Sequence, residues 1–184
     1  MAVKRKKRFG GFLLTIIFCA ASFAGGYYYY EWKIFGQAEY TTSVLDVVDG
    51  DTIEVEWFGG VSRLRLVGID TLETRHNKKL REQAAEWGLS EAEAYELGQK
   101  AKKITQDRLI GQLVTIQFPS GEIERDAFGR LLAYVFHNES DYGLFLVQQG
   151  LAYTRKESHI RERYYEWPMV QSRNDGMGIH KNGL

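Results

Sequence analysis

Three carboxylates and two arginines are spaced so that they could act together on a phosphate ester. Asp51 and Asp70 fall at the ends of two expected strands, and Glu73 follows Asp70 by three residues. Carboxylate oxygens suit Ca²⁺, and a cluster of like charges is costly unless a cation lies among them. Arg65 and Arg130 offer planar guanidinium groups that match phosphate oxygens better than lysine does. The set provides a cation site, a carboxylate to orient or deprotonate water, and positive charge for phosphoryl oxygens.

Each of these residues also has an ordinary interpretation when it is taken alone. Asp49 and Asp51 form a DGD sequence that is typical of a turn. Arg65 could be an exposed strand residue, Arg130 a hairpin residue, and Glu73 a solvated acid. Their joint occurrence, rather than any one of them, favours a working site.

Five short strands are expected to position these residues. Thr52 to Trp57 alternates apolar with polar residues, the period of a half-buried strand, and FGG at 58–60 forms the next turn. The first three strands are joined by tight turns and form a meander. The expected strands cover residues 40–48, 52–57, 63–67, 113–118 and 131–136.

Helices are expected after the third strand and at the end of the chain. Ser90 and Glu93 form a capping-box pattern, so a helix should begin near residue 90 and end near 109. Further helices are expected at 142–149 and 159–174, the second kinked or divided by Pro168. This order predicts a mainly β, α+β fold: a five-stranded OB-fold barrel with about three helices. The strand pattern alone leaves SH3-like and other small barrels open.

The first 35 residues predict a membrane-targeting segment, and residues 36–184 a single domain. KRKKR at 4–8 precedes an uncharged stretch, residues 9–30, which is near the length of about 20 needed to span a bilayer. Lys and Arg beside a membrane stay cytoplasmic, so the domain should lie outside. We favour a single-pass N-terminal hydrophobic helix as anchor. Secretion after cleavage near Ala24, and a buried core helix, are the alternatives.

The charge is divided unevenly along the chain. Residues 1–35 hold six basic side chains and one acidic, for +5, so the other 18 basic and 23 acidic side chains give −5. A mildly acidic body lacks the basic footprint usual in nucleic-acid binding. The single cysteine, Cys19, lies in the apolar stretch, which excludes a disulfide or a Cys-based metal site in the body.

Four segments together resemble the staphylococcal nuclease (thermonuclease-like) family. They are VVDGDTIEV (47–55), RLVGIDTLET (65–74), RDAFGRLLAYV (125–135) and LVQQGLAY (146–153), and they occur in the family's order. DGDT alone is a common turn, whereas four such segments on the right elements are specific. The resemblance covers about Thr42 to His180 and implies an OB-fold domain.

The resemblance also implies a calcium site. Asp51 and Asp70 match the family's calcium-ligating carboxylates, and Thr71 matches the residue that supplies a backbone carbonyl. Asp49 matches an acidic residue farther from the metal. We therefore expect Ca²⁺ as the cofactor.

Catalytic roles follow from the same resemblance. Glu73 matches the glutamate that acts on the attacking water, and Arg65 and Arg130 match the phosphate-binding arginines. The implied activity is endo- and exonucleolytic hydrolysis of DNA and RNA. Water attacks in line, the 5′ oxygen leaves, and the products carry 3′-phosphates.

Several positions depart from the family pattern. Leu72 stands where proline is usual, so the loop that carries Glu73 is less restricted in φ. Phe128 replaces a tyrosine, Ala127 removes a nearby lysine, and His180 replaces the tryptophan of a closing Gly-Ile-Trp. These changes bear on substrate preference and turnover more than on reaction type.

Four residues are expected to contact substrate: Phe128, Tyr153, Lys78 and Lys79. Lys78 and Lys79 could equally be a solvated face, and His76 reads as a surface histidine. We expect DNA or RNA as substrate, contact with the membrane through the N-terminal segment, and a monomer. The competing hypotheses are a catalytically inactive OB-fold that binds nucleic acid or protein, and a structural envelope protein with a vestigial site.

Overall fold

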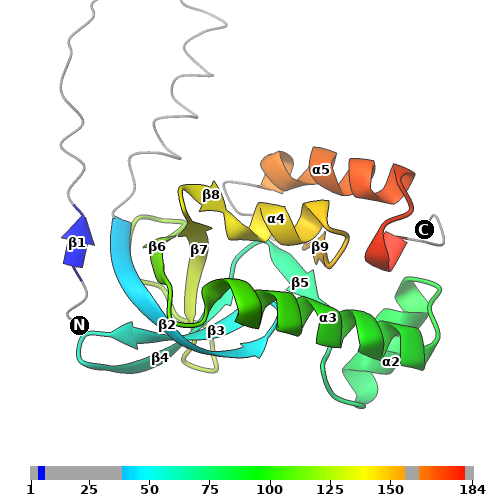
Figure 1. Ribbon diagram of the computed structural model, residues 1–184, viewed down its shortest axis with the longest axis horizontal. Coiled ribbons are helices and arrows are strands. Elements are labelled where there is room, and N and C mark those ends of the chain that lie inside the picture. The colour runs from blue at the N-terminus through cyan, green and yellow to red at the C-terminus, as the bar shows by residue number, and fades with distance from the viewer. Residues whose placement is uncertain (1–3, 7–38, 156–161, 181–184) are drawn as a thin grey trace, which may run out of the picture.

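The computed structural model describes residues 4–6, 39–155 and 162–180. Five strands close into a barrel, with pairing in the order β2-β3-β4-β7-β6 and β6 returning to β2. All neighbouring pairs are antiparallel except β4 and β7, which run parallel. The expected OB-fold barrel is confirmed (Figure 1). Its strands are β2 (Glu39–Asp49), β3 (Thr52–Trp57), β4 (Gly60–Leu66), β6 (Leu113–Gln117) and β7 (Leu131–His137).

Alternating side chains build the barrel core, as the period-2 pattern predicts. In β3, Ile53 and Val55 are fully buried while Glu54 and Glu56 are partly exposed. Leu64 of β4 and Leu131 of β7 are also fully buried and pair across the parallel register. Removing each such aliphatic side chain from water contributes about 1.5–3 kcal/mol. The barrel is therefore a rigid frame for the residues at its strand ends.

Four short strands were not expected from the sequence. β5 (Ile69–Thr71) pairs antiparallel with β9 (Ala152–Thr154), and β8 (Ser140–Asp141) pairs with β7. β1 (Lys4–Lys6) pairs with β2. Segments of two or three residues carry too little alternation to be recognised, because only their tertiary partners make them strands.

The domain has four α-helices among its described residues, not about three. They are α2 (Lys78–Glu86), α3 (Glu91–Leu109), α4 (Tyr142–Gln148) and α5 (Glu162–Asn174), followed by the 3-10 turn η1 (Gly178–His180). α2 was missed as a separate helix because nine residues give a weak periodic signal. The Asn77 side chain caps it by accepting from the Leu80 amide.

The other helix predictions agree with the structure except at Pro168. Ser90 and Glu93 form the reciprocal capping box that starts α3. α5 continues through Pro168 as one helix, so of the two expected effects of this residue, kinking or division, division does not occur. Pro168 is buried, and packing of its ring offsets the backbone hydrogen bond that it cannot donate.

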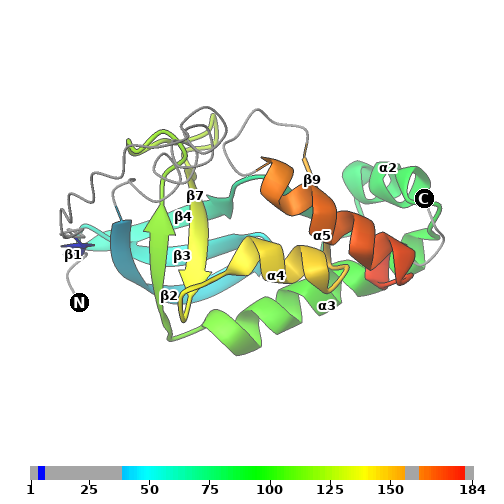
Figure 2. The same ribbon diagram turned by 90° about the horizontal axis from the view of Figure 1, so that it is seen from above.

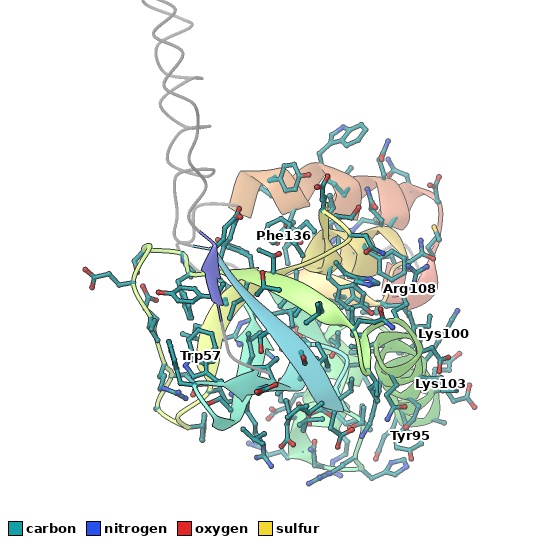
Figure 3. All side chains as sticks on the ribbon, turned by 60° about the vertical axis from the view of Figure 1, so that its left-hand side comes forward. Trp57, Tyr95, Lys100, Lys103, Arg108 and Phe136 are labelled. Carbon is teal, nitrogen blue, oxygen red and sulfur yellow. The ribbon has the colours of Figure 1, made fainter. Side chains whose placement is uncertain are left out.

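The helices lie on one side of the barrel. Figure 1 shows α5 above α4, with α3 running below and α2 beyond the start of α3. Figure 2 shows the barrel strands towards one end of the molecule and α2 at the opposite end. Lys100 and Lys103 extend from α3 away from the barrel (Figure 3), so the inner face of α3 is free to pack against the loops that follow β4.

A small second core joins α2, α3 and the chain end. It consists of Leu72, Leu80, Ala84, Trp87, Leu89, Ala94 and Ile179. The buried His180 ring meets the Trp87 ring edge to face, with centroids 5.1 Å apart. Burial, and then the charge of Arg173, lowers the pKa of His180. His180 thus packs as a neutral ring at the position where the family pattern has a tryptophan.

The expected hydrophobic anchor lies outside the described residues. Residues 9–30, with the cleavage position near Ala24, fall in the range 7–38 that is not described. No helix within the described ranges is both long and apolar enough to cross a membrane. The location of the domain stays a prediction.

Gly150 anchors the C-terminal segment, and an alanine there should destabilise the protein. Gly150 has φ +62°, and a Cβ would lie 2.3 Å from the Met177 carbonyl oxygen. The Ile179 amide also donates to the Gly150 carbonyl at 2.9 Å. We expect Gly150→Ala to lower the free energy of unfolding by about 2–4 kcal/mol, measured by urea denaturation.

Gly176 provides the matched control. It has the same φ of +62° with nothing within 4 Å of a Cβ. Gly176→Ala should therefore cost about 1–2 kcal/mol, from backbone strain alone. Equal losses in the two variants would show that the close approach at Gly150 does not matter.

Candidate active site

Arg65 lies between two buried carboxylates. Its Nη1 is 2.5 Å from Asp51 Oδ1 and its Nη2 is 2.6 Å from Asp70 Oδ1. The two acids are 2% and 5% exposed, and Arg65 is 8% exposed. β4 carries Arg65, the β2–β3 turn carries Asp51, and β5 carries Asp70. Pairing of β3 with β4 sets Thr52 opposite Arg65, so Asp51 lies beside Arg65, and β5 follows β4 directly to add Asp70.

The DGD turn is both a turn and part of the site. Asp51 Oδ2 accepts from the Thr71 amide at 2.8 Å and from the Thr71 hydroxyl at 3.2 Å. A Cβ on Gly50 would lie 2.8 Å from Ala101 Cβ and 2.9 Å from Thr71 Cγ2. Glycine is therefore needed for this turn to pass between α3 and β5. Asp49 and Asp51 therefore belong to a turn, as their sequence indicates, but Asp51 is also part of the site.

The two carboxylates have opposite pKa shifts. Burial, together with the charge of Asp70, raises the pKa of Asp51 despite the attraction of Arg65. Burial also acts on Asp70, but Arg65, Lys79 and the Tyr153 hydroxyl outweigh it and lower its pKa. Asp51 therefore carries negative charge that its protein neighbours do not fully compensate, which is the condition that a bound cation relieves.

Glu73 reaches the same cluster through Lys79. The Lys79 ammonium is 2.7 Å from Glu73 Oε1 and 3.5 Å from Asp70 Oδ2. Asn77 donates to Glu73 Oε2 at 3.1 Å. The Glu73 side chain is 23% exposed, so water can reach it. Lys79, expected from the sequence to contact substrate, is 48% exposed and pairs with two acids at the edge of the cluster, and its contact with substrate stays a prediction.

α2 and α3 hold the loop that carries Glu73. A Cβ on Gly98 would lie 2.4 Å from the Glu73 carbonyl oxygen, so α3 touches the loop backbone directly. Gln99 donates to the Thr74 carbonyl at 2.9 Å, and Gln83 accepts from the Glu73 amide at 2.9 Å. Sequence analysis missed Gln83, Gln99 and Gly98. No sequence signal marks them, because they contact the loop from helices 10 to 25 residues away along the chain.

Two further predicted residues join the edge of the cluster. Asp49 accepts a hydrogen bond from the Thr74 hydroxyl, so it steadies the Glu73 loop without touching the paired carboxylates. Tyr153 lies opposite Asp70 in the β5–β9 pair, and its hydroxyl donates to Asp70 Oδ2 at 2.9 Å. The aromatic residue expected to contact substrate is thus a direct partner of Asp70.

Arg130 and Phe128 lie on the loop before β7. Arg130 Nε and Nη2 each lie 2.7 Å from Asp126 Oδ2, and its guanidinium carbon is 5.5 Å from the Phe128 ring centre. Phe128 is 85% exposed. Because Leu132 pairs with Arg65, Arg130 enters the sheet beside the strand that carries Arg65. The structure gives Arg130 no direct contact with the buried cluster.

Lys78 and His76 lie on the solvated side of the loop. The Lys78 side chain is 85% exposed and pairs with Glu82 one helical turn later. His76 is 61% exposed, lies 2.9 Å from Glu91, and stacks on Tyr95. The interpretation of His76 as a surface histidine agrees with this position.

The donor set fits one hard divalent cation if backbone and water complete its shell. Within residues 4–6, 39–155 and 162–180, no group of three or more His, Cys, Asp or Glu could hold a metal ion. Ca²⁺ accepts six to eight oxygen ligands, many from carbonyls and water. Asp51 and Asp70 supply two carboxylates, and the Thr71 carbonyl follows Asp70 directly. The grouping of these two buried carboxylates around one guanidinium, next to the Thr71 carbonyl, is the observation that favours a cation here.

Comparison with known proteins matches the sequence of this chain to one family. A family model described as staphylococcal nuclease homologue matches residues 63–179. The chain belongs to the staphylococcal nuclease family. Thermonuclease of Staphylococcus hyicus is 30% identical to this nuclease-family chain over 145 residues, covering 78% of this chain and 75% of that protein.

Other relatives align with this family member over a smaller part of their length. The SPbeta prophage-derived endonuclease YokF of Bacillus subtilis is 33% identical over 105 residues, 57% of this chain and 31% of that protein. An uncharacterized protein of Methanocaldococcus jannaschii is 35% identical over 105 residues, 55% of this chain and 51% of that protein. The match therefore covers about half of the second protein and about a third of the first.

The opposite pKa shifts predict opposite effects of two similar substitutions. Measured without divalent cations at pH 7, Asp51→Asn should raise the midpoint of thermal unfolding, and Asp70→Asn should lower it. A raised folded-state pKa makes ionised Asp51 destabilising above its pKa, and this penalty disappears below the ordinary value of 3.8. A lowered pKa makes ionised Asp70 stabilising, and this contribution is lost as the pH falls below 3.8.

Unfolding curves between pH 3 and pH 8 check both signs. The gap between Asp51→Asn and the unsubstituted protein should close towards acid pH. A loss of stability at pH 7 in both variants would contradict the assigned asymmetry and would indicate a symmetric ion-pair triad.

Proposed function

We propose that this protein is a calcium-dependent nuclease that hydrolyses phosphodiester bonds of DNA and of RNA. Membership of the staphylococcal nuclease family supports the nuclease, as do relatives named thermonuclease and endonuclease. The observation that carries the proposal is the grouping of Asp51, Asp70 and Arg65 in one buried cluster, with Glu73 joined to it through Lys79.

The charges of this cluster support a divalent cation. Asp51, Asp70 and Glu73 bring three negative charges, and Arg65 and Lys79 bring two positive ones. A phosphodiester adds a further negative charge, which makes binding unfavourable without more positive charge. Calcium held by Asp51, Asp70 and the Thr71 carbonyl would supply that charge at the phosphoryl oxygens.

The arginines would bind the phosphate from two sides. Arg65 gives three of its five N–H groups to Asp51, Asp70 and the Ile69 carbonyl, which leaves N–H groups for a phosphate oxygen. Arg130 is 27% exposed and can turn from Asp126 towards a bound strand. Two planar cations placed at the developing charge stabilise an in-line displacement.

Glu73 is positioned to act on the attacking water. Lys79 and Asn77 fix one oxygen each, which leaves the second lone pair of each oxygen for water. The attack expels the 5′ oxygen and leaves 3′-phosphate products. Phe128, which is exposed next to Arg130, offers a face on which a base of a single strand can stack.

We further propose that the domain lies outside the cytoplasm, anchored in the cell membrane by residues 9–30. The support is in the sequence: KRKKR at 4–8 followed by 22 uncharged residues. In that arrangement Lys4–Lys6 stay on the cytoplasmic side, so the pairing of β1 with β2 does not form. Secretion after cleavage near Ala24 is the alternative.

Cleavage of heat-denatured DNA with calcium, and with calcium chelated, tests the nuclease. We expect cleavage when calcium is present and none when it is chelated. Glu73→Gln should lower kcat at least ~100-fold because it removes the base. Arg65→Ala should lower activity to a similar degree. The products should carry 3′-phosphates, measured by their failure to prime DNA synthesis until a phosphatase has acted.

Adjacent lysines provide the control. Lys79→Ala should reduce activity because it frees Glu73 and Asp70, whereas Lys78→Ala should change it less than ~2-fold. A folded protein that binds denatured DNA and never cleaves it, over a range of calcium and pH, would favour the inactive binding module.

Fractionation of bacterial cells that express the full chain tests the location. We expect the protein in the membrane pellet after alkaline carbonate extraction, and digestion of the domain by protease added to intact spheroplasts. If the medium contains a chain that lacks about the first 24 residues, the protein is secreted after cleavage and is not anchored. Protection from protease would place the domain inside the cell.

A further inference from the structure

We propose that Gln83 is a positioning residue that orients the Thr71 carbonyl for the cation and holds Glu73 in place. The inference rests on the proposed function. Gln83 lies in the middle of α2, is 3% exposed, and is one of the few polar side chains of this helix that face inward. Its amide group contacts three separate parts of the site.

The hydrogen bonds fix the orientation of the Gln83 amide. Nε2 donates to the Thr71 carbonyl at 3.1 Å and lies 3.1 Å from the Tyr153 hydroxyl. Oε1 accepts from the Glu73 amide at 2.9 Å. A flipped amide would set its NH₂ group against the Glu73 N–H and its oxygen against the Thr71 oxygen. Only one orientation of the Gln83 amide therefore satisfies both of its N–H donors and its oxygen acceptor.

The bond to Thr71 leaves room for a cation. A carbonyl oxygen has two lone pairs, and Gln83 takes one of them. The Thr71 amide is bound to Asp51 at the same time, so the peptide groups on both sides of Thr71 are fixed. The second lone pair of the carbonyl is thereby held in one direction, next to Asp70 and Asp51, which would be its fellow ligands.

The bond to Glu73 restrains a loop that lacks the family's proline. Leu72 leaves φ at this position free to vary, whereas proline fixes it. Gln83 holds the loop from α2, and Gly98 presses α3 against the Leu72 and Glu73 carbonyls from the other side. Tertiary contacts thus supply the restraint that the local sequence does not.

The third contact links Gln83 to Asp70. Tyr153 accepts from Gln83 and donates to Asp70 Oδ2 at 2.9 Å. One side chain is thereby connected to the carbonyl of Thr71, the backbone of Glu73 and, through Tyr153, the carboxylate of Asp70. Removing it should disturb both cation binding and catalysis, without removing any group that touches the substrate.

Two nearly isosteric substitutions of Gln83 test this role. Gln83→Met keeps the length and loses all three hydrogen bonds, and Gln83→Glu keeps the acceptor for the Glu73 amide but opposes the Thr71 oxygen. We expect both to weaken calcium binding ~10–100-fold in isothermal titration calorimetry. We expect kcat to fall ~10–100-fold at saturating calcium, with KM for denatured DNA changed less than ~3-fold.

Gln117→Met is the matched control. Gln117 of β6 is also buried, at 4% exposed, and its amide donates at 2.7 Å to Glu39, at the opposite end of β2 from Asp49. Its calcium affinity and kcat should stay within ~3-fold of the unsubstituted protein. Circular dichroism and urea unfolding establish that each variant is folded. If Gln83→Met does not fold, Gln83→Glu, which keeps one of the bonds, carries the test.

The outcomes separate this inference from the proposed nuclease. Folded Gln83 variants with unchanged calcium affinity and unchanged kcat would overturn the positioning role and leave the nuclease intact. Unsubstituted protein that binds calcium without cleaving nucleic acid would refute the nuclease. In that case, a selective loss of calcium affinity in the Gln83 variants would still support the orientation of Thr71. Equal losses in the Gln117 variant would show that losing any buried glutamine amide has this effect, and would overturn the inference.

Discussion

The guanidinium of Arg65 lies between the carboxylates of Asp51 and Asp70, in a part of the protein that water barely reaches. Charges in such a place are tolerated only when they are paired and hydrogen-bonded. Three separate elements must therefore meet for any of these charges to be buried: the β2–β3 turn, β4 and β5. The other residues of the site are placed by their contacts with these three elements.

The surrounding elements fix this meeting point at close range. Gly50 lets the DGD turn pass between Ala101 and Thr71, and Gly98 lets α3 touch the loop after β5. The small core around Leu72 and Trp87 then holds α2 against that loop. Because packed interiors tolerate little change in volume, these contacts transmit the position of the helices to Glu73. The helices therefore do more than cover the barrel.

The departures from the family pattern have different structural consequences. The flexibility expected from Leu72 is offset by Gln83, Gln99 and Gly98, which hold the loop from two helices. His180 is accommodated as a buried neutral ring against Trp87. Phe128 stays exposed beside Arg130, so its lost hydroxyl changes what it can offer a phosphate and leaves its stacking face available.

The sequence by itself determined the barrel strands, the start of α3 and the identity of the acids and arginines. These features depend on local periodicity, on a capping box at Ser90 and on motifs within ten residues, all of which are legible along the chain. The tertiary structure decided the rest. Strands β5 and β9, the pairing of Lys79 with Glu73, and the three bonds of Gln83 join residues up to 85 positions apart, as in Ile69 and Thr154. Such contacts produce no periodic pattern in the sequence, because they stabilise segments that meet only in the folded protein.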